Sequence, residues 1–100
     1  MIRHIVMFKL REYTSPIEKK TALHAIRNEL LNLKKTIPVI LEFEVGINIS
    51  DSKAAFDLVI NSSFSTMDYL KTYQVHPDHL AFIEFNKNYT VEKTVIDYEY

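Results

Sequence analysis

The chain has 100 residues, of which 47% are hydrophobic and 25% charged, and this is the balance of one globular domain over residues 1–100 rather than of a disordered segment. A net charge of −1 excludes the broad basic surface of a general nucleic-acid-binding protein. The absence of cysteine excludes disulfides, thiolate catalysis and cysteine-ligated metals, and no apolar run reaches the ~18 residues that cross a membrane. Because the first residues alternate instead of forming an apolar block, we expect no signal peptide and a cytoplasmic location.

The first two expected elements are a strand and a long helix. Residues 2–10 alternate as a strand does, and one face carries Ile2, His4, Val6, Phe8 and Leu10. Ser15-Pro16-Ile17-Glu18 starts a helix, because serine caps, proline fits the first helical position and glutamate can complete a capping box. The apolar stripe of this helix recurs every three or four residues, at Leu23, Ile26, Leu30, Leu33 and Ile37. The helix should end by about Thr36, since a residue before proline disfavours helix and Pro38 follows.

The rest of the chain predicts two strands, two helices and a final strand. Residues 39–47 alternate again, and Gly46 within them indicates a bulge or a close approach of the backbone. A turn over 48–53 leads to a strand over about 55–64. Ser65 is the expected cap of a helix that Pro77 breaks near Val75, and a second helix follows over 78–87. The last strand covers about 89–98.

The order βαββαβ is typical of an α+β fold in which helices cover one face of a four-stranded antiparallel sheet. The other face of this sheet would mix Ile5, Met7, Ile40 and Val59 with Arg3, Lys9, Glu42 and Asp57. An apolar strip edged with opposite charges favours the self-complementary interface of a homodimer. A solvated sheet face is the alternative, since antiparallel sheets tolerate one.

The side chains able to act in catalysis are most concentrated in residues 73–79, Tyr-Gln-Val-His-Pro-Asp-His. A neutral imidazole is a general base near pH 7 and a phenol can donate to a developing oxyanion, so His79 and Tyr73 are the candidate catalytic residues. His76 stands before Pro77, where a helix cap would sit, and this favours a structural role for His76. His79 lies inside the helix and cannot cap it, so both roles stay open for His79.

The remaining polar features are His4, the possibility of a metal at the histidine pair, and the acidic C-terminal segment. His4 is the one polar side chain on the inward face of the first strand, where a hydrogen-bonded core role is the common one, although it could share a pocket with Tyr73 or His79. Two histidines need a third ligand to hold a metal, and because none is evident we expect no metal. The acidic segment Asp97-Tyr98-Glu99-Tyr100 favours a strand end over a site.

Five stretches, in this order and spacing, carry a family resemblance: residues 4–9 HIVMFK, 44–48 EVGIN, 56–59 FDLV, 73–79 YQVHPDH followed by Phe82, and 95–98 VIDY. Over its whole length the chain resembles the stress-responsive A/B barrel domain (Dabb) family. The resemblance implies a ferredoxin-like domain that pairs into a homodimer, in which the sheets of two chains form a dimeric α/β barrel.

The wider superfamily includes cofactor-free monooxygenases, lactone isomerases and haem-handling enzymes, and some plant members of the family are polyketide cyclases. In those cyclases a tyrosine and a histidine act in a cleft between helices and sheet, which implies such roles for Tyr73 and His79 and a pocket position for His4. The chain departs from the cyclases at Leu58, where they have a further histidine, and at the aliphatic Ile26 and Leu30 of the first helix.

Two functions follow as hypotheses. The first is a domain that binds a small hydrophobic or carbonyl compound between helices and sheet, with His4, His76, Phe8 and Leu30 as ligand-binding residues. The alternative is a polyketide cyclase-like or monooxygenase-like enzyme without a cofactor, in which His79 abstracts a proton α to a carbonyl and Tyr73 holds the oxygen that becomes negative. Haem ligation by His76 or His79 is a third alternative. An open cavity lined by His4, Tyr73 and His79 would favour a ligand, whereas a filled space with His79 bonded to backbone would favour a structural role.

Overall fold

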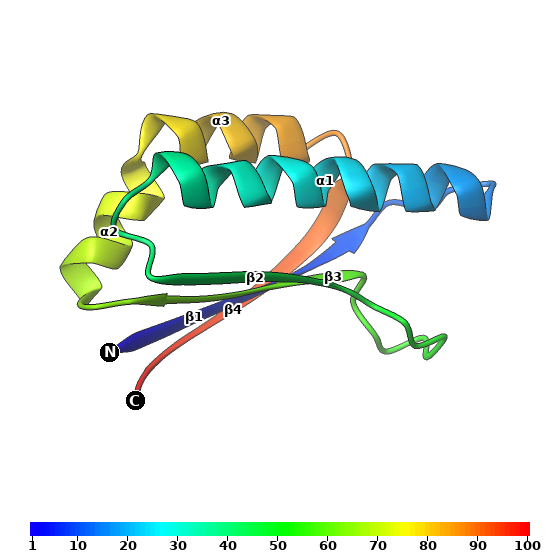
Figure 1. Ribbon diagram of the computed structural model, residues 1–100. Coiled ribbons are helices and arrows are strands. Elements are labelled where there is room, and N and C mark those ends of the chain that lie inside the picture. The colour runs from blue at the N-terminus through cyan, green and yellow to red at the C-terminus, as the bar shows by residue number, and fades with distance from the viewer.

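The computed structural model describes residues 1–100 as one sheet with three helices on one of its faces (Figure 1). The elements are β1 (Ile2–Leu10), α1 (Pro16–Thr36), β2 (Glu42–Ile47), β3 (Leu58–Phe64), α2 (Met67–Val75), α3 (Pro77–Asn86) and β4 (Thr90–Glu99). The strands lie in the order β2-β3-β1-β4, and every neighbouring pair is antiparallel. This is the expected α+β fold, and the ferredoxin-like sheet with helices on one face is confirmed. None of the three helices combines the length and the apolar character that a bilayer span requires.

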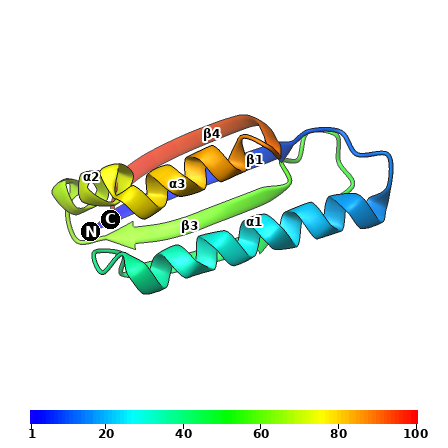
Figure 2. The same ribbon diagram turned by 90° about the horizontal axis from the view of Figure 1, so that it is seen from above.

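The core lies between the helices and the inward side chains of β1 and β3. Burial alternates along β1 as the sequence predicts, because successive side chains of a strand point to opposite faces. Ile26 and Leu30 on α1 are fully buried against this surface. Seen from above, α1 runs along the β3 side of the sheet and α3 runs over β1, towards β4 (Figure 2). The edge strand β4 is therefore the least covered, and its residues from Val91 to Glu99 are all exposed.

The helix starts follow the expected capping chemistry, with one shift. Ser15 Oγ accepts the backbone N–H groups of Ile17 at 3.2 Å and Glu18 at 3.4 Å, so the predicted cap of α1 is confirmed. The cap of α2 is Thr66 and not Ser65, because Thr66 Oγ1 stands three residues before the N–H of Tyr69 and accepts it at 3.2 Å.

Two strands begin later than predicted. The segment before β2 turns at Pro38, where the Ile40 N–H donates to the Ile37 carbonyl at 3.3 Å, and β2 starts only at Glu42. Ile40 is therefore a core residue, 2% exposed, and its expected place on the outer sheet face is wrong. Likewise β3 starts at Leu58, because the Ala55 N–H closes a turn onto the Ser52 carbonyl.

Asp57 is also displaced from the outer face on which it was expected. Its carboxylate accepts the Leu10 N–H at 2.8 Å and pairs with Lys19 of α1 at 2.8 Å. Both partners draw it towards the end of β1 and the helix layer. Asp57 thus joins β1 to α1 and contributes no charge to the outer face.

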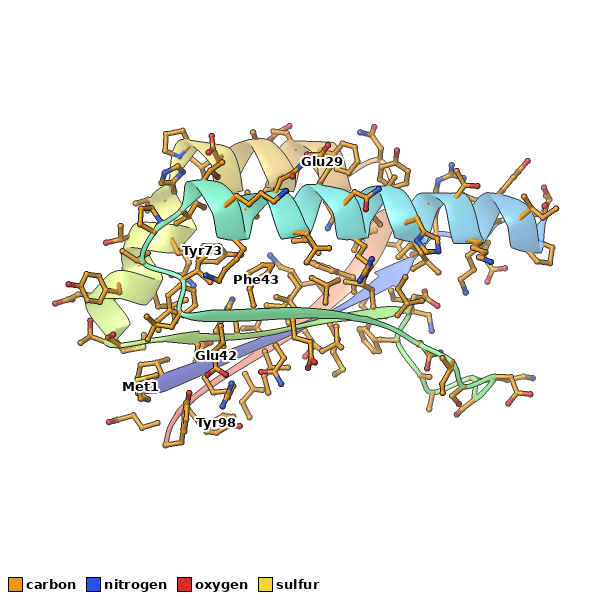
Figure 3. The ribbon with its side chains drawn as sticks, in the orientation of Figure 1. Met1, Glu29, Glu42, Phe43, Tyr73 and Tyr98 are labelled. Atoms are coloured by element: carbon orange, nitrogen blue, oxygen red, sulfur yellow. The ribbon has the colours of Figure 1, made fainter.

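The outer sheet face keeps the apolar strip that the sequence indicated. Ile5, Met7 and Val59 lie on it, and β4 adds Ile96, 59% exposed, and Tyr98, 45% exposed. Figure 3 shows Tyr98 and Glu42 on the side of the sheet away from the helices. At Gly46 the strand register is regular, without a bulge, and it is the side chain of Val59 that approaches the backbone: a Cβ atom there would stand 3.0 Å from Val59 Cγ1. At one edge of the strip the Arg3 guanidinium lies 4.3 Å from the Tyr100 ring and 3.7 Å from Glu42.

Candidate functional site

Tyr73 is the centre of a cluster of rings between the helices and the sheet. It sits on α2 and is 1% exposed. Its ring centroid lies 4.4 Å from that of His79, 5.2 Å from Phe64, 6.2 Å from His4 and 6.3 Å from Phe43. Figure 3 shows Tyr73 and Phe43 in the layer between helices and sheet. His4, from the start of the chain, therefore meets Tyr73 and His79 in one cluster.

The break between α2 and α3 brings His79 onto Tyr73. His76 has extended backbone angles, as expected of a residue before proline, and it ends α2 and caps α3. Its Nδ1 accepts the Asp78 N–H at 3.1 Å, which confirms the predicted capping role. The chain bends there, and His79 in the first turn of α3 lies against the last turn of α2, where it contacts Tyr73 and Gln74.

His79 is held as a neutral base with one free nitrogen. Its Nδ1 lies 3.0 Å from the carbonyl oxygen of Gln74, and because a carbonyl can only accept, Nδ1 carries the proton. The lone pair is then on Nε2. Burial lowers the pKa of His79 below its ordinary value of 6.5; the bond to Gln74 opposes this shift, and positive charge on His4, Lys93 and His76 adds to it. The imidazole is therefore uncharged at pH 7.

Tyr73 supplies the complementary group. Burial raises the pKa of its phenol well above the ordinary value of 10.0, so the hydroxyl stays protonated. Tyr13 Oη is the only fully occluded side-chain oxygen or nitrogen without a hydrogen-bond partner. The Tyr73 hydroxyl, which has no partner within the chain, accordingly keeps some accessible surface. It is a donor without an acceptor.

Asp97 is a member of the site that sequence reasoning missed. It stands opposite His4 across the β1–β4 ladder, and its carboxylate accepts from His4 Nδ1. The acidic C-terminal segment was expected to be a strand end only. The strand register is the signal that would have found the contact, because an inward His4 paired directly with residue 97 makes that residue inward as well.

An open cavity of about 370 Å³ lies under α2 and α3 and over β1 and β4. His4, Tyr73 and His79 are on its wall, and the apolar lining includes Val6, Phe8, Ile60, Phe82, Ile83 and Val95. This volume is in the range of small-molecule sites. An open cavity lined by His4, Tyr73 and His79 is the arrangement that favours a ligand site. The hydrogen bond from His79 to the Gln74 carbonyl shows that the histidine also braces the backbone.

Two of the expected ligand-binding residues are not brought to the cavity. Leu30 is fully buried on α1, where it packs in the core, and His76 is turned to its capping bond. His4 and Phe8 do reach the wall. No three histidine, aspartate or glutamate side chains come together as metal ligands.

The arrangement can move a proton. A neutral imidazole with a free Nε2 lies against a protonated phenol, and both face a partly apolar cavity. A base can abstract a proton from carbon only if the resulting charge finds a donor, and the two groups provide base and donor respectively.

Residues 2–100 match the family model described as Stress responsive A/B Barrel Domain, Dabb. The protein SCO4036 of Streptomyces coelicolor is 31% identical over 105 residues, covering 100% of both chains. The sequence similarity thus extends over the cavity, the helix break and all four strands.

Solved structures share the whole architecture. A dimeric protein of ferredoxin-like fold from Bacteroides fragilis superposes with a TM-score of 0.88 at 29% identity, over 99% of this chain and 95% of that chain. The hydroxynitrile lyase of Passiflora edulis superposes with a TM-score of 0.74 at 20% identity, over 97% of this chain and 90% of that chain. At that identity the likeness to the lyase shows the fold alone.

Proposed function

The chain belongs to the stress responsive A/B barrel domain (Dabb) family, and we propose that it binds a small hydrophobic or carbonyl compound in the cavity between α2, α3 and the sheet. The observation that carries this proposal is the cavity itself, about 370 Å³ and open to solvent. A core that served stability alone would close such a space, because unfilled volume beside buried side chains costs free energy.

The composition of the wall indicates the ligand. Most of the floor is aliphatic or aromatic, with Phe8 and Phe82 6.2 Å apart between ring centroids. Among the polar groups of the wall, Tyr73 and His79 lie together, with 4.4 Å between their ring centroids. An aromatic ketone fits this division, since its ring would cover the apolar wall and its carbonyl oxygen would accept from the Tyr73 hydroxyl.

We predict that 2-acetylnaphthalene binds with about millimolar affinity or better, as expected of a ligand of this size. In a ¹H–¹⁵N NMR titration the largest shifts should fall on cavity residues such as Val6 and Phe82. The variant Val95→Trp places an indole at the wall and should weaken binding at least about tenfold by occupying the space. Val75→Trp is the matched control, because Val75 is exposed and outside the cavity. Equal affinity in the two variants, or no shifts at all, would remove the proposal.

A second function, acid/base catalysis without a cofactor, is favoured by the state of His79. Its Nε2 has the lone pair, and burial keeps the ring neutral. In the proposed step Nε2 takes a proton from the carbon next to the ketone, the electron pair of that C–H bond forms the enolate, and the Tyr73 O–H donates to the enolate oxygen. The proton on Nε2 then exchanges with a deuteron of the solvent, and His79 delivers that deuteron to the enolate carbon, so that in heavy water the net result is exchange of hydrogen for deuterium.

We predict that the protein accelerates deuterium incorporation into the methyl group of 2-acetylnaphthalene, followed by ¹H NMR. His79→Gln keeps a group that can bond Gln74 but has no base, and should slow exchange by about 10²-fold or more. The rate should fall as pH drops through the pKa of His79, which lies below 6.5, because the imidazolium has no free lone pair.

The control for this experiment is His24→Gln, which alters an exposed histidine on α1. It should leave the exchange rate unchanged. If His79→Gln exchanges as fast as the unaltered protein while the ketone still binds, the catalytic role fails and the binding role survives.

We further propose that the partner of this chain is a second copy, joined through the outer sheet face. The supporting observation is an apolar strip that no helix covers, in which Met7, Ile96 and Tyr98 are exposed and Ile5 and Val59 are half-buried. In a dimer with a twofold axis, the strip of one copy packs against the same strip of the other. Arg3 of one copy can then face Glu42 of the other at the edge of the strip. The solved relative from Bacteroides fragilis is a dimer of the same fold.

Light scattering at micromolar concentration should give the mass of two chains. Ile96→Glu sets a charge in the strip and should give the mass of one chain, since an unpaired carboxylate resists burial. Ile49→Glu is the control, because Ile49 is fully exposed on the β2–β3 loop and away from the strip. A single-chain mass for the unaltered protein would overturn this proposal.

A further inference from the structure

Lys93 occupies an unusual place for a lysine. It lies on β4 directly across from Phe8 of β1, and Phe8 is an inward, buried residue. The register therefore sets Lys93 on the helix-facing side of the sheet, and it is part of the cavity wall. The lysines and arginines of β1 and α1 lie outside this cavity.

No carboxylate of the protein pairs with Lys93. The five ion pairs of the chain do not include it. Asp97, on the same side of β4, is engaged by His4. Glu92 also reaches the wall, but it neighbours Lys93 in sequence and alternates to the opposite face, across from Lys9.

The second lysine at the cavity, Lys87, already has a carboxylate partner. Lys87 Nζ lies 2.7 Å from Glu84 Oε1, one turn back along α3. One ammonium, that of Lys93, is thus left without a partner beside a largely apolar wall. Apolar surroundings exclude water from one side of a charge pair and strengthen it relative to a pair in open solvent.

We propose that the cavity selects a hydrophobic carboxylic acid, whose carboxylate pairs with Lys93 while its apolar body fills the space below α3. This rests on the proposed function and names the class of compound that the site takes. A single free cation matches a monoanion, and the ring of the acid covers the same wall as the ring of an aromatic ketone.

Lys93 and His79 line the same cavity, so one ligand can contact both. The charge of Lys93 also lowers the pKa of His79. A carboxylate held at Lys93 would place the rest of the molecule along the wall towards Tyr73 and His79.

The test compares 2-naphthoate with 2-naphthamide, two compounds of nearly the same shape of which only the first is charged at pH 7. Isothermal titration calorimetry or NMR titration should show the acid binding about three- to tenfold tighter than the amide. The preference should shrink in about 0.5 M salt, because added ions screen an exposed charge pair.

Lys93→Met should abolish the preference by weakening the acid, and leave the amide unchanged. Lys93→Arg keeps the charge and should restore the preference. Lys71→Met is the control for net charge, since Lys71 is exposed on α2 and is not part of the cavity. It should retain the preference.

The outcomes separate the two proposals. Equal affinity of the acid and the amide in the unaltered protein, or a preference that survives Lys93→Met, overturns selection of an acid while leaving the cavity as a binding site. Failure of both compounds and of 2-acetylnaphthalene to bind removes the binding function itself.

Discussion

Pro77 cannot continue α2, because proline has no N–H to donate and its ring forces the preceding residue out of the helical conformation. His76 therefore has extended backbone angles, and its ring caps α3 by accepting the Asp78 N–H. The chain bends at this point, and the His79 ring lies 4.4 Å from the Tyr73 ring, centroid to centroid. The contact of these two rings, the opening beside them and the bond from His79 to Gln74 all follow from this break.

Burial shifts the pKa values of Tyr73 and His79 in opposite directions, and both shifts favour the neutral form. It raises the pKa of Tyr73, which would be negative if ionised, and lowers the pKa of His79, which would be positive. Both groups are therefore neutral near pH 7, one as a donor and the other as an acceptor. The partly apolar cavity thus holds both groups in the forms that proton transfer requires.

The fold could be predicted from the sequence because strand alternation, the stripe of α1 and the breaks at proline all agree. The site was predicted in part: Tyr73, His79 and His4 came from residue type and position, and the cavity joins them. Leu30 could not be distinguished from a wall residue, since a helix stripe does not tell core from cavity. Asp97 was missed because its contact with His4 depends on strand register, which alternation alone leaves open.

The protonation state of His79 tests most directly whether this side chain can act as a base in the cavity. Long-range ¹H–¹⁵N NMR of the imidazole rings reports the tautomer and, over a pH series, the pKa. The structure predicts that at pH 7 His79 is neutral with its proton on Nδ1, and that its pKa lies below the ordinary 6.5. A protonated His79 at pH 7, or a proton on Nε2 with Nδ1 free, would contradict the assignment of His79 as a base facing the cavity.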